Sequence, residues 1–176
     1  MIRLSALFFI LTLSAYVTPA LAAPGQQVIG EAGVTDGDTI RMPVATLKEN
    51  GKTTAVQNVK IRLSGIDAPE KNQPCGDTNG TPYACGQVSL KAMADLIKGQ
   101  MIVCNIEGVD RYRRFIAVCA TPQNPDIGAD MVRNGLAVAY RKYSTDYIDE
   151  EDVAREQRSG VWQGTFDMPW DWRKAH

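Results

Sequence analysis

The apolar residues of this sequence form a series of short segments with two different periods, and these periods limit the folds that the chain can adopt. In residues 56–66, Val59, Ile61 and Leu63 alternate with polar side chains. This period of two is that of a half-buried β-strand, and it places Arg62 on the face opposite Ile61. In residues 87–98 the apolar side chains instead recur at helical spacing, and Gly99 supplies a stop signal.

The same criteria predict further elements on both sides of these segments. Asn50-Gly51 is a hairpin turn signal, because both residues accept a positive φ. Short helices that end near a glycine are predicted at 127–134 and 147–159. Strands are predicted at residues 27–34, 39–47, 56–66, 101–106 and 115–121. Five short strands with one helix between the third and the fourth predict an α+β fold: a five-stranded OB-type β-barrel with three helices.

The N-terminal segment has the pattern of a secretory signal. Arg3 is its only charged residue, residues 4–17 are almost wholly apolar, and Ala20-Leu21-Ala22 has the small-residue pattern of a cleavage site. We therefore expect a signal peptide at residues 1–22 and a single domain at residues 23–176, with a tryptophan-rich C-terminal tail. The alternative is a retained membrane anchor, although the apolar run is short for a membrane span. The expected location is outside the cytoplasm, periplasmic or secreted, without membrane contact after cleavage.

Export to an oxidising compartment favours disulfides for the four cysteines. Cys75 and Cys85 bracket a loop rich in Gly, Pro and Asn, and Cys104 and Cys119 lie in two predicted neighbouring strands. We expect the pairs Cys75–Cys85 and Cys104–Cys119. A zinc site is the alternative, but no pair has the Cys-x-x-Cys spacing.

Charge and histidine content narrow the possible chemistry. The formal net charge is −1, and removal of Arg3 with the signal would make it −2. A protein that binds nucleic acid tightly and without sequence preference is usually basic, so any basic surface here must be local. His176 is the only histidine, which disfavours a Ser-His-Asp triad and leaves carboxylates and arginines as candidate groups.

Three polar motifs carry these candidate groups. They are the runs Asp36-Gly37-Asp38-Thr39, Gly65-Ile66-Asp67-Ala68-Pro69-Glu70 and Asp110-Arg111-Tyr112-Arg113-Arg114. Taken singly, the first is compatible with a tight turn, the second with a strand that ends in a loop, and the third with a solvated charged turn. In a barrel the first two can lie at one rim. Carboxylates there could bind a hard cation such as calcium, and arginines could bind phosphate in a bidentate way.

Together and in this order, the motifs resemble those of the thermonuclease family, the staphylococcal-nuclease-like domains. The resemblance covers about residues 34–162, including Gly135-Leu136-Ala137 before Tyr140 and the run Gly160-Val161-Trp162. It implies a calcium-dependent endonuclease that cleaves DNA and RNA, single strands preferred, and leaves a 3′-phosphate and a 5′-hydroxyl. We expect a monomer without a stable protein partner.

The resemblance also implies a role for each matching residue. Asp38 and Asp67 would bind Ca²⁺ through their carboxylates, and Ala68 would bind it through its carbonyl oxygen. Glu70 would hold the attacking water, and Arg62 and Arg114 would bind phosphate oxygens. Tyr112, Tyr140, Arg111 and Arg113 would contact the nucleic acid.

One position departs from the family pattern. The family has glycine between the tyrosine and the last arginine of the third motif, and this chain has Arg113. If that position needs a positive φ, arginine is costly there, and the turn could slip so that Arg113 instead of Arg114 faces the metal. Two other functions stay open: a non-catalytic OB-type module that binds nucleic acid, glycan or protein, and an accessory factor for exported polysaccharide.

Overall fold

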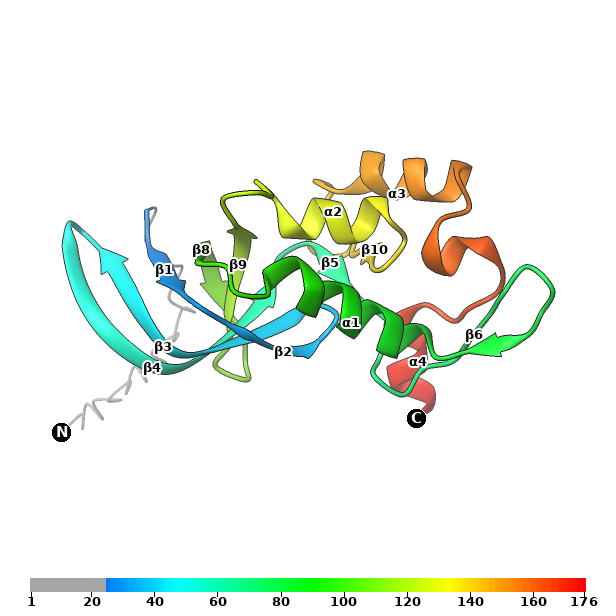
Figure 1. Ribbon diagram of the computed structural model, residues 1–176, viewed down its shortest axis with the longest axis horizontal. Helices are drawn as coiled ribbons and strands as arrows, with labels where there is room; N and C mark the ends of the chain where they lie inside the picture. Colours follow the sequence, from blue (N-terminus) through cyan, green and yellow to red (C-terminus); the bar gives the residue numbers. More distant parts are fainter. Residues whose placement is uncertain (1–24) are drawn as a thin grey trace, which may run out of the picture.

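A computed structural model describes residues 25–176 of the chain (Figure 1). The predicted signal peptide, residues 1–22, lies outside the described residues. The long strands are β1 (Gln27–Gly30), β2 (Gly33–Asp36), β3 (Thr39–Glu49), β4 (Lys52–Leu63), β8 (Ile102–Val109) and β9 (Phe115–Ala120). Four two-residue strands form two further pairs: β5 (Ile66–Asp67) with β10 (Val138–Ala139), and β6 (Cys75–Gly76) with β7 (Pro82–Tyr83).

The long strands close into the predicted barrel. β1 pairs with β8, β8 with β9, β9 with β4 and β4 with β3, and the pairing of β3 back onto β1 closes the circuit. All of these pairings are antiparallel except β4–β9, which is parallel. The first predicted strand is interrupted between Gly30 and Gly33, so its second part, β2, pairs only with β3. The α+β prediction with a five-stranded OB-type barrel is confirmed.

Local sequence signals explain the two features of the barrel that matter most for the site. Asn50 and Gly51 have φ values of 50° and 73°, so they form the predicted tight turn between β3 and β4. In β4, the side chains of Val59, Ile61 and Leu63 are buried in the barrel, as their alternation predicts. Arg62 therefore points to the other side of the strand, toward the rim where the acidic motifs lie.

The helices differ in number from the prediction. The first three are α1 (Cys85–Ile97), α2 (Ile127–Arg133) and α3 (Ile148–Glu156), close to the expected ranges. A fourth helix, α4 (Pro169–Ala175), follows a 3₁₀ turn at Gly160–Gln163 and lies in the predicted tryptophan-rich tail, in addition to the three predicted helices. Pro169 stands at the first position of α4, where proline suits a helix start.

Both predicted disulfides are present. Cys75–Cys85 joins β6 to the first residue of α1, and Cys104–Cys119 joins the facing residues of β8 and β9. No free cysteine remains among the described residues, so these four side chains are not available for zinc. Within residues 25–176 no helix is long and apolar enough to cross a membrane.

The arrangement of the helices determines what surrounds the site. α1 contacts β2, and α2 contacts α3 and β9. The last segment of the chain passes β6 and ends in α4, which lies beside the loop that follows β5 (Figure 1). The C-terminus therefore returns to the end of the barrel that carries the first two acidic motifs.

Candidate active site

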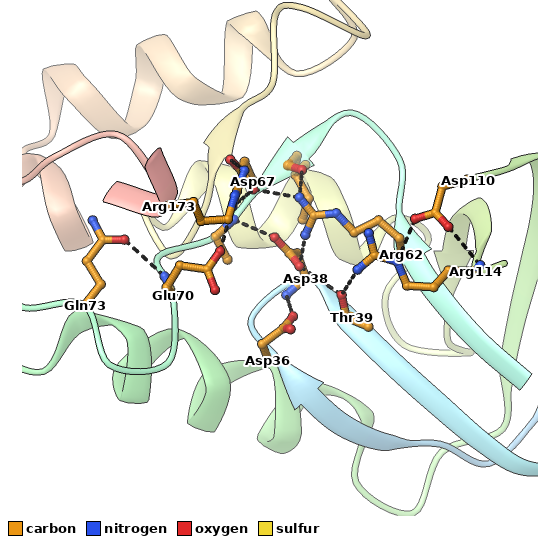
Figure 2. Close-up of polar contacts among 12 residues, drawn as sticks. Asp36, Asp38, Thr39, Arg62, Asp67, Glu70, Gln73, Asp110, Arg114 and Arg173 are labelled. Atoms are coloured by element: carbon orange, nitrogen blue, oxygen red, sulfur yellow. Dashed lines mark hydrogen bonds and ion pairs between the residues drawn. The ribbon is translucent and has the colours of Figure 1, made fainter. Parts of the chain in front are cut away.

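The acidic residues of the first two motifs meet at one end of the barrel. Asp38 lies in the turn between β2 and β3, Asp67 lies in β5, and Glu70 follows in the next loop. Figure 2 shows the carboxylates of Asp38 and Asp67 against Arg62, which extends from the end of β4, and the carboxylate of Glu70 beside Arg173. The sequence motifs are far apart in the chain, and the closure of the barrel brings them together.

Arg62 bridges two buried carboxylates. Its guanidinium forms an ion pair with Asp38 and another with Asp67, where Nη2 lies 2.7 Å from Oδ1. Asp38 is 4 % exposed and Asp67 is 0 % exposed. Buried carboxylates are stable only if they are paired and hydrogen-bonded, and Asp38 also accepts a hydrogen bond of 2.8 Å from the amide of Ala68. Burial lowers the pKa of Arg62 and Asp67 opposes this effect, but a guanidinium stays charged at neutral pH.

A second arginine, Arg173 of α4, bridges Asp67 and Glu70. Its Nη1 donates to Asp67 Oδ1 at 2.9 Å and to Glu70 Oε1 at 2.7 Å, and its Nη2 donates to Asp67 Oδ2 at 2.8 Å. Burial lowers the pKa of Arg173, but the hydrogen bonds to Asp67 and Glu70 outweigh burial, and the net pKa is raised. The sequence did not predict a role for Arg173, because no periodic signal marked the tail as an ordered part of the site.

The loop that carries Glu70 is fixed from two directions. The amide of Glu70 donates to Gln73 Oε1 at 3.1 Å, and Gln73 Nε2 donates to the carbonyl of Asp167 at 2.6 Å. At Gly86, the second residue of α1, an added Cβ would lie only 1.8 Å from the Glu70 carbonyl oxygen. Because Gly86 has no side chain, the loop can lie directly against α1, and the adjacent Cys75–Cys85 disulfide holds it there. The Glu70 side chain itself is 35 % exposed, so water can reach it.

The third motif forms a tight turn between β8 and β9. The Asp110 carboxylate accepts hydrogen bonds of 2.9 Å from the amides of Tyr112 and Arg114, and one of 2.7 Å from Arg114 Nε. Partial burial raises the pKa of Asp110, but these hydrogen bonds outweigh it, and the net pKa is lowered. Arg113 has a φ of 64°, so the conformation that glycine favours is kept with arginine in its place.

The alternative in which this turn slips is not the one that the structure adopts. Arg113 is exposed, whereas Arg114 is partly buried and its Nη1 lies 3.4 Å from Thr39 Oγ1. Thr39 Oγ1 in turn lies 3.1 Å from Asp38 Oδ1. Arg114 is therefore connected to the acidic cluster through one hydroxyl group. Arg111 lies over the ring of Tyr112, 4.8 Å from its centroid, on the exposed side of the turn.

Tyr140 lies beside the cluster but has aromatic neighbours on two sides. Its amide donates to the carbonyl of Gly65 at 2.8 Å, directly before the second acidic motif. Its ring stacks on Trp170 of α4, with centroids 5.2 Å apart and planes 6° from parallel, and meets the edge of Tyr143 at 4.8 Å. One face of the predicted nucleotide-contacting ring is therefore covered by the C-terminal helix.

Asp36 is a further acidic residue close to the site. Its carboxylate accepts a hydrogen bond of 3.2 Å from the amide of Asp38, which fixes the turn. Burial raises the pKa of Asp36, while Thr39 and Arg62 act in the opposite direction. The sequence motif contained Asp36, but the prediction gave it no role.

The carboxylates have the right chemistry for a hard cation, but arginines stand between them. Carboxylate and carbonyl oxygens from Asp38, Asp67, Glu70 and Ala68 are the donors that calcium prefers. Within residues 25–176, however, no three His, Cys, Asp or Glu side chains are gathered in an arrangement ready to hold a metal. These oxygen donors fit a divalent cation when the guanidinium groups of Arg62 and Arg173 no longer contact the carboxylate oxygens.

Comparisons with known proteins show which family the chain resembles. Residues 60–164 match the family model described as "Staphylococcal nuclease homologue". A protein named micrococcal nuclease from Shigella flexneri is 34 % identical over 81 % of this chain and 78 % of its own length. A protein of Haemophilus influenzae named as an uncharacterized endonuclease is 33 % identical over 80 % of this chain and 70 % of its own.

One relative has a name of another kind. The succinoglycan biosynthesis protein ExoI of Rhizobium meliloti is 30 % identical over 81 % of this chain and 68 % of its own length. Proteins with nuclease names and a protein named for polysaccharide synthesis are therefore similar to this chain to nearly the same degree.

Proposed function

The chain belongs to the staphylococcal nuclease family, and we propose that it is an exported, calcium-dependent nuclease that hydrolyses DNA and RNA, with single strands preferred. The observation that carries the proposal is the cluster in which Arg62 bridges Asp38 and Asp67 while Glu70 lies in the adjoining loop. A phosphodiesterase needs a cation site, an oriented water and cationic donors for the phosphoryl oxygens. The cluster contains groups suited to each of these tasks.

In this proposal each residue has a defined task. Asp38, Asp67 and the carbonyl oxygen of Ala68 hold calcium, which neutralises charge on the phosphate when it is bound. Glu70 accepts a hydrogen bond from the attacking water and orients it toward phosphorus. Arg62 binds a phosphoryl oxygen, and Arg114 binds the phosphate on the side of the departing 5′-oxygen.

The bond changes are those of simple hydrolysis. A water oxygen bonds to phosphorus and the bond from phosphorus to the 5′-oxygen breaks, so that the products are a 3′-phosphate and a 5′-hydroxyl. The water loses one proton to Glu70 or to solvent, and the 5′-oxygen gains one. Arg62 and Arg114 remain charged throughout, because guanidinium groups do not deprotonate at working pH.

Substrate contact beyond the cleaved bond is assigned to Tyr112, Tyr140, Arg111 and Arg113. Tyr112 is 63 % exposed and is available for stacking on a base, which is a sequence-tolerant contact. The low net charge of the chain predicts weak substrate capture and a shallow dependence of binding on salt.

We further propose that residues 23–176 form a single exported domain that acts as a monomer without a stable protein partner. The two disulfides support a location outside the cytoplasm, because such bonds persist in oxidising compartments. The cleavage of residues 1–22 is tested by N-terminal sequencing of the protein recovered from the periplasm or the medium. An N-terminus at Met1 would contradict it.

The nuclease assay uses residues 23–176 with both disulfides formed, and single-stranded DNA or RNA as substrate. We expect hydrolysis in calcium and none after chelation. Glu70→Gln should lower the rate by about 10²-fold or more, whereas Glu156→Gln, an exposed control at the end of α3, should retain it. Undiminished hydrolysis by Glu70→Gln, or a rate of hydrolysis that the chelator does not change, would contradict the proposal.

The similarity to the succinoglycan biosynthesis protein favours a second candidate, an accessory role in polysaccharide export. A non-catalytic module on the same barrel would also leave nucleic acid uncut. A glycan-binding screen run beside the nuclease assay separates them. Glycan binding without calcium-dependent cleavage would favour the accessory role, and binding of nucleic acid alone without cleavage would favour the module.

A further inference from the structure

The C-terminal helix places a positive charge among the residues proposed to bind calcium. Arg173 contacts both carboxylate oxygens of Asp67 and one oxygen of Glu70, at 2.7–2.9 Å (Figure 2). Asp67 is fully buried, and its Oδ1 also accepts from Arg62. Every oxygen of Asp67 is therefore engaged by a guanidinium group.

The formal charges of the cluster suit a divalent cation better than this arginine. Asp38, Asp67 and Glu70 contribute three negative charges and Arg62 contributes one positive charge, so two negative charges remain. Arg173 balances only one of them. A calcium ion would balance both, but it needs oxygen atoms that the guanidinium now holds, and buried carboxylate oxygens offer few further lone pairs.

Several contacts seat α4 so that Arg173 is held at the cluster. Trp170 stacks on Tyr140, the carbonyl of Asp167 accepts from Gln73, and Pro169 is buried. A tethered group acts at a high effective concentration. A metal ion in solution must therefore compete for the carboxylates with the Arg173 guanidinium, which is always present.

We propose that Arg173 is a built-in competitor of the metal ion, which must displace its guanidinium from Asp67 and Glu70 before the site can fill. The inference rests on the proposed calcium site. It assigns to the C-terminal helix the role of a latch: α4 stabilises the metal-free carboxylates and raises the calcium concentration at which the site becomes occupied. After displacement, the Arg173 side chain is free of the cluster.

Direct calcium binding tests the inference without relying on activity. Isothermal titration of chelator-treated protein with calcium chloride would compare the unchanged chain with Arg173→Gln and Lys174→Gln. Lys174 is the matched control, because it lies on the same helix, carries the same charge and pairs only with Asp171. We expect Arg173→Gln to bind calcium at least about tenfold more tightly, and Lys174→Gln to change the affinity by less than about twofold, since charge-assisted hydrogen bonds are among the strong ones.

A second measurement on the unchanged chain covers the case in which Arg173→Gln does not fold. Nitrogen–proton NMR of the arginine side chains should show the Arg173 guanidinium protected in the metal-free protein and released as calcium is added. Release supports the latch, and a guanidinium signal that calcium leaves unchanged overturns it.

The outcomes separate this inference from the proposed function. Equal or weaker calcium affinity in Arg173→Gln would overturn the latch and leave the calcium site intact. The absence of calcium binding in all three proteins would overturn both the latch and the proposed calcium dependence. Equal tightening in Arg173→Gln and Lys174→Gln would show an effect of net charge, and would also overturn the latch.

Discussion

Replacement of Arg62 by alanine is the perturbation whose cost follows most directly from the structure. Arg62 pairs with two carboxylates, Asp38 and Asp67, and donates a hydrogen bond of 3.1 Å to the carbonyl of Ile66. The Arg62 side chain is 16 % exposed and the carboxylates are almost fully buried. Alanine at this position therefore leaves buried charge without its main counter-ion.

The expected loss can be bounded. Removing one partner of a buried ion pair costs about 3–5 kcal/mol of unfolding free energy. Asp67 keeps Arg173 as a counter-ion, and Asp38 keeps hydrogen bonds from Ala68 and Thr39. We therefore expect a smaller loss of about 2–3 kcal/mol in the metal-free protein, and a smaller one still in calcium, which would neutralise the same carboxylates.

Urea unfolding in chelator and in calcium measures the loss under both conditions. An unchanged slope of unfolding free energy against urea concentration would show that only stability has altered. Arg111→Ala is the control: its guanidinium is exposed and donates only to the hydroxyl of Tyr112, so it should change the free energy by no more than about 0.5 kcal/mol. A loss below about 1 kcal/mol for Arg62→Ala in chelator, or one equal to that of the control, would show that Arg62 is not the main counter-ion of the buried carboxylates.

Three further predictions concern the turn and the barrel. Arg113→Gly should raise the free energy of unfolding by up to about 1 kcal/mol, because glycine adopts the φ of 64° without strain; a loss of stability would contradict it. Joint replacement of Cys104 and Cys119 by alanine should cost about 3 kcal/mol, as expected for a disulfide that spans 15 residues; a cost under about 1 kcal/mol would contradict the entropic argument. Asp110 has a lowered pKa, so its contribution is complete above the unfolded value of 3.8 and is lost as pH falls through the lower folded value. Urea unfolding measures the difference in stability between the unchanged chain and Asp110→Asn. This difference should be constant near neutral pH and should decrease in acid; an increase in acid would contradict the lowered pKa of Asp110.

Much of the barrel, and the direction of Arg62 on it, could be predicted because the signals are local. The alternation around Ile61 specifies which face of β4 is buried, and with it the direction of Arg62. The Asn50-Gly51 pair specifies a tight turn by its preference for positive φ. The disulfide between Cys104 and Cys119 follows once two neighbouring strands are recognised.

The C-terminal contribution to the site could not be predicted in the same way. α4 has only seven residues, too few for a clear helical period, and its position depends on long-range contacts such as the stacking of Trp170 on Tyr140. Nothing in the local sequence indicates that Arg173 reaches Asp67, 106 residues earlier. The positive φ of Arg113 was likewise a question for the structure, because only the surrounding hydrogen bonds show that the turn is kept.

The calcium-dependent nuclease activity is tested by the initial rate of single-stranded DNA hydrolysis as a function of free calcium, with analysis of the ends produced. We expect a rate that rises from zero with calcium, and products that carry 3′-phosphate and 5′-hydroxyl ends. Hydrolysis at full rate without calcium, or products with 5′-phosphate ends, would contradict the roles proposed for Asp38, Asp67 and Glu70.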